Sequence, residues 1–190
     1  MSVSSLKLFL KTNAGTCALV LVLISSLSLN VFLSIKLGRF LFPPPVAIKV
    51  KTTIRSPLDV QDQSGNPTSL TFVGQSRPTV LYVLSPNCGW CKRNEANIRA
   101  LFSATSARYR FIGLSVDEKG LSEYLAQQHI PFPVYLVTSE KQKDKLGLYD
   151  TPQTAVITRD GKVQQSWPGA YVGNNLKEIE EYFGVKLPGL

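Results

Sequence analysis

Two cysteines separated by two residues constrain this chain more than any other feature of its sequence. Cys88-Gly89-Trp90-Cys91 follows an apolar run over residues 79–84 that is rich in β-branched and aromatic side chains, as is typical of a buried strand. After the motif, apolar residues recur at helical spacing between residues 92 and 102. The pattern predicts a dithiol at a strand-to-helix junction, and the chemistry expected there is thiol–disulfide exchange.

The position of Cys88 at the start of a helix indicates which thiol reacts first. Unpaired N–H groups and the helix dipole favour an anion at a helix N-terminus, and the thiolate is the reactive form of cysteine. We therefore expect Cys88 to be the nucleophile. Cys91, one turn further into the helix, is expected to be more buried and to resolve a mixed disulfide by attacking the sulfur of Cys88.

Other uses of a Cys-x-x-Cys pair fit the sequence less well. A structural zinc site needs about four ligands, and the only other cysteine and histidine residues are Cys17 and His129. Covalent haem attachment requires a histidine directly after the second cysteine, where this chain has Lys92. An inert structural disulfide stays open as an alternative, although so short a loop adds little stability. We expect no metal and no other cofactor.

The N-terminal part of the chain contains a long uncharged apolar segment. No charged residue occurs from residue 12 to residue 35. A helix of this length is long enough to cross a hydrocarbon core of ~30 Å. We predict a transmembrane anchor over residues 12–37, preceded by a cytoplasmic tail over residues 1–11. A cleaved signal peptide stays open as the alternative, but no small-x-small cleavage site follows the apolar run, which favours an anchor.

The formal net charge of +8 lies almost entirely in residues 1–57, which contain no acidic residue. Basic residues beside an apolar segment suit anionic lipid headgroups and give no support to nucleic-acid binding. Residues 38–57, with three consecutive prolines at 43–45, are predicted to be a basic, extended linker. The flanking charges leave the membrane orientation ambiguous. We place the domain on the extracytoplasmic, periplasmic side because a tethered dithiol is most useful where disulfides form.

Residues 58–190 are predicted to form one folded domain. Hydrophobic periodicity and turn residues indicate an N-terminal hairpin, alternating strands and helices, and a C-terminal hairpin followed by a helix. The expected elements are strands near 58–60, 70–73, 79–84, 109–116, 130–135, 153–158 and 162–167, and helices near 92–102, 117–128, 140–146 and 174–183. This order predicts an α/β fold with a central mixed sheet flanked by helices.

The domain resembles thioredoxin-fold proteins of the membrane-anchored TlpA/ResA-like group of thiol–disulfide oxidoreductases, which border on the peroxiredoxins of the AhpC/TSA type. The resemblance rests on the cysteine motif after a strand, on a central insert over residues 111–134, and on the segment 151–157 followed by Asp160-Gly161. It implies that Pro152 is cis and faces the dithiol. It also implies that the backbone of Thr151 pairs with an incoming substrate strand, and we expect Trp90 to form the rim of the contact surface.

The chain departs from that family at one position. Many relatives carry an acidic or polar residue six positions before the first cysteine, and here that position is Tyr82. The proton acceptor for Cys91 is therefore open. Glu95, one turn after Cys91, is a weaker candidate that is expected to be a surface glutamate, and His129 is expected to have a structural or solvated role.

Three functions follow from these observations. The first is a membrane-tethered, monomeric thiol–disulfide oxidoreductase that acts on protein cysteines and is itself served by a redox partner protein. The second is a peroxiredoxin-like thiol peroxidase, whose pattern is half met, because Ser85 precedes Cys88 by three residues while the expected proline position is Leu81. The third is a thioredoxin-fold binding module without catalysis.

Overall fold

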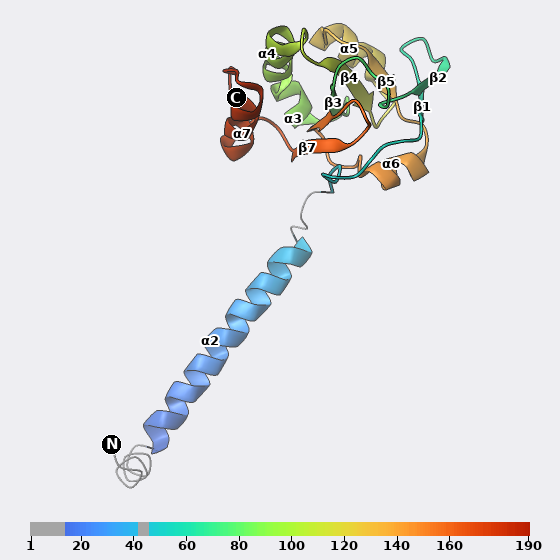
Figure 1. Ribbon diagram of the computed structural model, residues 1–190. Coiled ribbons are helices and arrows are strands. Elements are labelled where there is room, and N and C mark those ends of the chain that lie inside the picture. The colour runs from blue at the N-terminus through green and yellow to red at the C-terminus, as the bar shows by residue number, and fades with distance from the viewer. Residues whose placement is uncertain (1–13, 42–45) are drawn as a thin grey trace. The chain divides into compact units, whose positions relative to one another are not determined.

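The computed structural model describes residues 14–41 and 46–190, and these two stretches belong to two separate compact units (Figure 1). The tail predicted over residues 1–11, the first two residues of the anchor predicted over 12–37, and residues 42–45 of the expected linker lie outside the described residues, as does the side chain of Cys17. The elements are α2 (Ala14–Leu41), β1 (Leu58–Gln61), β2 (Pro67–Leu70), β3 (Thr79–Leu84), α3 (Gly89–Arg93), α4 (Glu95–Thr105), β4 (Arg110–Ser115), α5 (Leu121–Gln128), β5 (Val134–Leu136), α6 (Glu140–Leu146), β6 (Gln153–Ile157), β7 (Val163–Pro168) and α7 (Gly173–Phe183).

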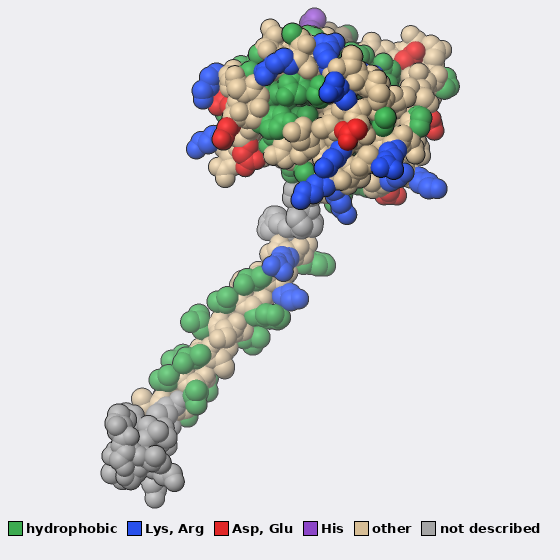
Figure 2. All heavy atoms as spheres, viewed as in Figure 1, with side chains coloured by type: hydrophobic (Ala, Val, Ile, Leu, Met, Phe, Trp, Pro, Cys, Tyr) green, Lys and Arg blue, Asp and Glu red, His purple; other side chains and the backbone are tan. Residues whose placement is uncertain are grey.

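The first unit consists of helix α2. Its stretch Ala18–Leu41 is long and apolar enough to cross a membrane, and none of it is buried against other parts of the described protein. Figure 2 shows apolar side chains exposed along the helix. At 1.5 Å per residue, 24 residues extend about 36 Å. The helix extends to Leu41, further than the end predicted at residue 37.

The second unit is built on a seven-stranded mixed sheet in the order β2-β1-β5-β4-β3-β6-β7. Strands β3, β4 and β5 run parallel to one another, while β6 and β7 continue the sheet antiparallel beyond β3. On the other side, the hairpin of β1 and β2 joins antiparallel to β5. The central strand β3 is buried along its whole length, so the loop that follows it leaves the sheet from a rigid position.

One face of the sheet, here called the aromatic face, is covered by helices α3, α4, α5 and α7. Alternate residues of the strands point to this face because successive side chains on a strand alternate. Its core consists of Val80, Tyr82, Leu84, Phe111, Val134, Val156 and Trp167 from the strands, packed with Cys91, Ile98, Leu101, Tyr124, Ile179 and Phe183 from the helices and with Tyr171 and Phe132. The rings of Trp167, Tyr182 and Phe183 pack edge-to-face or tilted, with centroids 4.9–5.9 Å apart.

The opposite face, here called the aliphatic face, is covered by α6 and by the segment before β1. Its core consists of Leu81, Val83, Ile112, Leu114, Ala155, Ile157 and Val163 from strands β3, β4, β6 and β7, with Leu146 and Leu148 from α6 and its exit, and Ile48, Ile54, Leu58, Val60, Leu70, Phe72 and Val137. Phe72 is the one aromatic side chain among its buried members. The two faces are therefore chemically different although they share the same strands.

Residues 46–55, here called the strap, belong to this folded unit. Ile48 and Ile54 are buried in the aliphatic core. The strap also exchanges backbone hydrogen bonds with the start of β7, from Lys51 N to Val163 O and from Val163 N to Thr52 O, each 2.8 Å long. Within the linker predicted over residues 38–57, ahead of the domain start expected at residue 58, two buried isoleucines and a set of backbone hydrogen bonds attach residues 46–55 to the domain.

Most of the other predicted elements match the structure, but the strand expected near residues 70–73 lies earlier, at Pro67–Leu70. The strand over residues 79–84 and the helix over 140–146 have the expected bounds, and both hairpins form. The helix expected from residue 92 is instead two helices, α3 and α4, separated at Asn94, whose backbone has φ −78° and ψ −2°. The helix expected over 117–128 begins only at Leu121, and the extended segment over 130–135 forms a short strand that ends at Leu136.

Candidate active site

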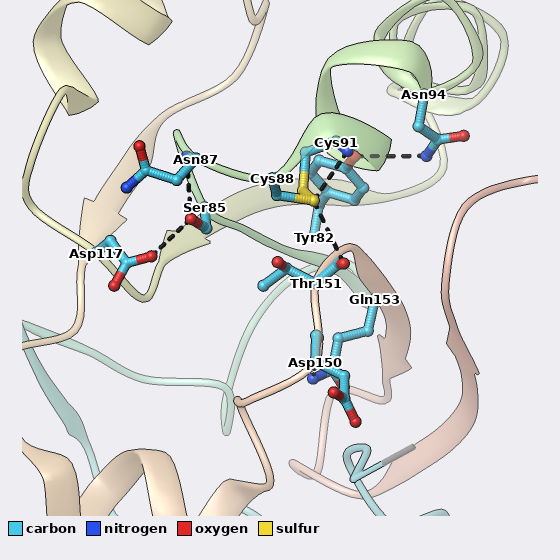
Figure 3. The surroundings of a disulfide bond; sticks show 10 residues. All are labelled: Tyr82, Ser85, Asn87, Cys88, Cys91, Asn94, Asp117, Asp150, Thr151 and Gln153. Carbon is cyan, nitrogen blue, oxygen red and sulfur yellow. Dashed lines mark hydrogen bonds between the residues drawn. A yellow bond between two sulfur atoms is a disulfide. The ribbon is translucent and has the colours of Figure 1, made fainter. Parts of the chain in front are cut away.

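The two cysteines lie where the loop after β3 enters α3, and they form a disulfide with a Cα–Cα distance of 5.2 Å (Figure 3). Cys88 is the N-cap of α3, with extended backbone at φ −82° and ψ 107°. Cys91 is fully buried in the aromatic core, whereas Cys88 is partly exposed. The expected difference between an accessible first sulfur and a buried second sulfur is therefore present.

The sulfur of Cys88 receives a backbone hydrogen bond from its own helix. The N–H of Cys91 donates to Cys88 Sγ over 3.0 Å. In the reduced protein, the same N–H would face a thiolate, and N–H donors at a helix start stabilise negative charge on such an atom. This geometry favours Cys88 as the sulfur that ionises and attacks.

The loop between α6 and β6 lies against the same sulfur. Thr151 O is 3.3 Å from Cys88 Sγ, and the peptide bond between Thr151 and Pro152 is cis. The expected cis bond at Pro152 is present. Thr151 is partly exposed and Pro152 is buried.

A surface cavity of about 420 Å³ opens beside Cys88. It is lined by Ser85, Asn87, Cys88, Val116, Asp117, Glu140, Lys143, Leu148, Tyr149 and Thr151. Its lining therefore contains the accessible sulfur, the Thr151 backbone and charged groups of both signs. Within it, Lys143 Nζ pairs with Glu140 Oε1 over 2.7 Å.

Trp90, between the two cysteines, is half exposed, with 50% of its surface accessible. The guanidinium carbon of Arg93 lies 4.8 Å from the centre of its ring, which is within the range of a cation–π contact. A large apolar surface is thus held open next to the disulfide. The role of Trp90 at the rim of a contact surface stays a prediction.

Behind Cys91, the aromatic core contains a buried hydrogen-bonded network that the sequence did not reveal. Its centre is Asn94, which donates through Nδ2 to the hydroxyl of Tyr82 over 3.4 Å and accepts through Oδ1 from Tyr171 N over 3.0 Å. Asn97 Nδ2 donates to the same oxygen over 3.3 Å, and Tyr171 shares a 2.7 Å hydrogen bond with Thr154. The one available signal was an asparagine inside a helical stretch, a residue that favours helix ends.

Among residues 14–41 and 46–190, no aspartate or glutamate is buried, so no buried carboxylate lies behind the dithiol beside Tyr82. Burial raises the pKa of Tyr82 well above its ordinary value of 10.0, so this hydroxyl stays protonated at physiological pH. Glu95 pairs with Arg99 over 3.0 Å along the surface of α4. His129 is exposed at the end of α5, in a left-handed conformation with φ 48°, which fits the expected structural or solvated role.

Ser85, the residue on which the peroxidase alternative rests, is engaged with another side chain. Its hydroxyl donates to Asp117 Oδ2 over 2.6 Å and accepts from Asn87 N over 3.1 Å. The hydroxyl therefore ties the loop after β3 to the loop after β4 at the edge of the cavity.

Comparison with solved structures reveals the fold of the second unit. The thioredoxin domain of a thiol-disulfide oxidoreductase from Bacteroides vulgatus superposes with a TM-score of 0.56 at 18% identity, over 72% of this chain and 99% of that one. A secreted Mycobacterium tuberculosis disulfide oxidoreductase homologous to Escherichia coli DsbE gives 0.55 at 14% identity, over 67% and 94% of the two chains. Peroxidoxin BcpB from the same species gives 0.56 at 18% identity, over 72% and 97%.

The sequence comparison points to one family. A search of curated proteins finds no significant match. The AhpC/TSA family matches residues 53–166, which is more than half of the chain and includes the disulfide, the cis proline and most of the sheet. With the thioredoxin-like fold of its second unit and an apolar helix in front, the chain belongs to the AhpC/TSA family.

Proposed function

We propose that this protein is a thiol–disulfide oxidoreductase that exchanges disulfides with cysteines of other proteins through Cys88 and Cys91. The observation that carries the proposal is the asymmetry of the pair: Cys88 is partly exposed, receives an N–H donor and lies 3.3 Å from the Thr151 backbone, whereas Cys91 is fully buried. An inert structural disulfide has no need of an accessible sulfur beside a cavity and an exposed aromatic ring.

In the reducing direction, the thiolate of Cys88 attacks one sulfur of a substrate disulfide. A mixed disulfide forms between Cys88 and the substrate, and the other substrate sulfur leaves as a thiolate that takes up a proton. Cys91 then loses its proton and attacks Cys88 Sγ, which releases the second substrate thiol. Two electrons and two protons pass to the substrate, and the Cys88–Cys91 disulfide seen in the structure is the product. The oxidising direction reverses these steps.

Substrate binding is assigned to three groups around Cys88. An extended segment of the substrate pairs with the Thr151 backbone by strand addition, and Pro152 holds that backbone in place. Trp90 offers apolar surface to the residues that flank the substrate cysteine. The enzyme needs no metal or cofactor for this chemistry, because the electrons reside in the two sulfurs.

Helix α2 is proposed to be a membrane anchor. Its length, its uncharged sequence up to Lys36 and its exposed apolar surface support this assignment. The catalytic domain is placed on the extracytoplasmic side as a monomer. There, a redox partner protein would restore the state of the disulfide after each cycle.

Trapping of the covalent intermediate tests the proposal. With Cys91→Ser, attack by Cys88 still occurs but the mixed disulfide is not resolved, so adducts with protein partners should accumulate on non-reducing gels and disappear with reductant. Cys88→Ser should form none and should lose insulin disulfide reduction. A folded Cys91→Ser protein that forms no adducts would show that the exchange mechanism is wrong and would leave a binding module.

The peroxidase alternative has its own test. Its support is the AhpC/TSA family match and the likeness to a peroxidoxin, while the Ser85 hydroxyl is bonded to Asp117. The reduced protein should consume hydrogen peroxide no faster than the Cys88→Ser variant. Rapid peroxide consumption that depends on Cys88 would favour the peroxidase instead.

A further inference from the structure

Gln153 has a buried side chain that the exchange mechanism does not use. It directly follows Pro152 at the start of β6, and no part of it is accessible to solvent. A buried amide without hydrogen bonds is costly, so its partners show what it holds together. Because side chains alternate along a strand, Gln153 points to the same face as Ala155 and Ile157, which belong to the aliphatic core.

The amide of Gln153 is hydrogen-bonded on both sides. Its Oε1 accepts from Ile48 N of the strap over 3.1 Å. Its Nε2 donates to Gly147 O at the end of α6 over 2.9 Å and to Asp150 O over 2.8 Å. The partners fix the orientation of the amide, because a backbone N–H must face the oxygen and two carbonyls must face the nitrogen. Three segments of chain therefore converge on one side chain.

These hydrogen bonds lie next to Thr151, on the side away from the disulfide. In Figure 3, Asp150 and Gln153 lie beyond Thr151 as seen from Cys88. The strap reaches the loop twice, since Val46 N donates to the carboxylate of Asp150 and Ile48 N donates to Gln153. In the sequence, Thr151 lies between the two residues that the strap contacts, and its carbonyl oxygen is 3.3 Å from Cys88 Sγ.

The strap is itself a rigid support. At Gly147, where φ is +69°, a Cβ atom would lie 2.8 Å from the carbonyl oxygen of Ala47, so the end of α6 packs directly on the strap backbone. Ile48 is buried in the aliphatic core beside this contact. Displacement of the loop that contains Thr151 would therefore require breaking the amide hydrogen bonds or moving the core.

We propose that Gln153 is the positioning residue that holds the Thr151 backbone at the distance from Cys88 at which a polypeptide substrate can pair with it. This inference rests on the proposed function and adds to it a residue that acts through Thr151. A polypeptide disulfide depends on backbone pairing at Thr151, whereas a small disulfide needs only the sulfur of Cys88. Loss of Gln153 should therefore affect the two substrate classes differently.

The test uses Gln153→Met in the full-length, detergent-solubilised protein, because methionine has a similar length and makes none of the three hydrogen bonds. Rates of disulfide reduction by the reduced protein are measured with insulin and with bis(2-hydroxyethyl) disulfide. We expect kcat/KM for insulin to fall by about tenfold, equivalent to ~1.4 kcal/mol. The rate with the small disulfide should stay within about twofold.

Two further variants keep the test decisive. Thr105→Val is the matched control: it removes another fully buried hydrogen-bonding side chain, whose hydroxyl donates to Leu101 O over 2.7 Å, and both rates should stay unchanged. Asp150→Ala removes only the carboxylate that accepts from Val46 N and should give a smaller loss with insulin alone. It replaces Gln153→Met if the methionine variant does not fold.

Equal losses with both substrates, or no loss with either in a folded variant, would overturn the positioning role. That result differs from failure of the proposed function itself. If the proposed function were wrong, the unmodified protein would reduce neither substrate, and the Cys88→Ser change would not alter either rate.

Discussion

The aromatic and aliphatic faces of the sheet are built on the same strands, yet they contain different kinds of groups. On the aromatic face, Cys91 is surrounded by rings and by a network of buried hydroxyls and amides centred on Asn94. On the aliphatic face, branched side chains form the core, and the amide of Gln153 links the strap to the loop. The buried sulfur of the dithiol thus belongs to the aromatic face, while the aliphatic face supports the backbone of Thr151, which lies beside the other sulfur.

This division shows that the site depends on both faces in different ways. Substitutions on the aromatic face should lower the stability of the domain and alter the surroundings of the sulfurs. Changes on the aliphatic face near the strap should act on the loop that contains Thr151. Three stability measurements can break or sharpen the comparison, and they are described from the largest expected effect to the smallest.

Trp167→Ala should have the largest effect. Trp167 is 2% exposed and packs on the rings of Tyr182 and Phe183. Removal of a buried tryptophan side chain typically lowers the free energy of unfolding by about 3–5 kcal/mol, which urea denaturation would measure. The matched control is Trp90→Ala, where the exposed ring contacts Arg93 and the loss should stay below about 1 kcal/mol. Equal losses at both positions would contradict the described packing of the aromatic face.

Ile48→Ala tests whether the strap is part of the aliphatic core. Ile48 is 3% exposed, and truncation of a buried isoleucine typically lowers the free energy of unfolding by about 2–5 kcal/mol. Val50→Ala, two residues later and 42% exposed, should change it by less than about 0.5 kcal/mol. If both changes had the small effect, residues 46–57 would be the linker that the sequence suggested.

Tyr171→Phe should have the smallest effect and a distinctive dependence on pH. The change leaves the buried hydroxyl of Thr154 without its 2.7 Å partner, which should lower the free energy of unfolding by about 1–3 kcal/mol at neutral pH. Urea denaturation of the variant and of the unmodified protein would measure this difference.

The pH dependence arises because the aromatic face contains several buried tyrosines. Burial raises the pKa of Tyr171 and of Tyr82, and burial with a smaller contribution from Glu95 raises the pKa of Tyr124 to about 12. Unfolded tyrosines ionise near pH 10. The stability that these groups contribute is therefore complete below about pH 10 and is lost as the pH rises above it. Tyr171→Phe should make this alkaline loss shallower, and an unchanged slope would contradict the assignment.

Short sequence patterns correctly predicted those elements whose structure depends mainly on residues close together in the sequence. The strand over residues 79–84 consists of consecutive β-forming residues, and the helix over 140–146 has a clear start at Ser139, whose hydroxyl accepts from Gln142 N. The cysteine motif likewise identified both sulfurs, and the family resemblance gave the cis bond at Pro152.

Features that depend on distant partners could not be predicted in this way. The strap has only two buried isoleucines, too few for a periodic pattern. The three prolines that precede it in the sequence, together with its lysines, are typical of a linker. Asn94 ends α3 because its side chain is bonded to Tyr82 and to the backbone of Tyr171, which is 77 residues away in the sequence. Gln153 depends on Ile48, 105 residues earlier. Such contacts become visible only when the chain is folded.

The strap also protects one of the two edges of the sheet. The outermost strand β7 starts with Val163, whose N–H and carbonyl are both taken by the strap, and ends with Pro168, which has no N–H to offer. At the other margin, β2 is only four residues long and begins with Pro67. Open strand margins invite intermolecular pairing and aggregation. Because both edges of the sheet are protected in this way, the backbone at Thr151 is left as the place where the proposed pairing with a substrate strand can occur.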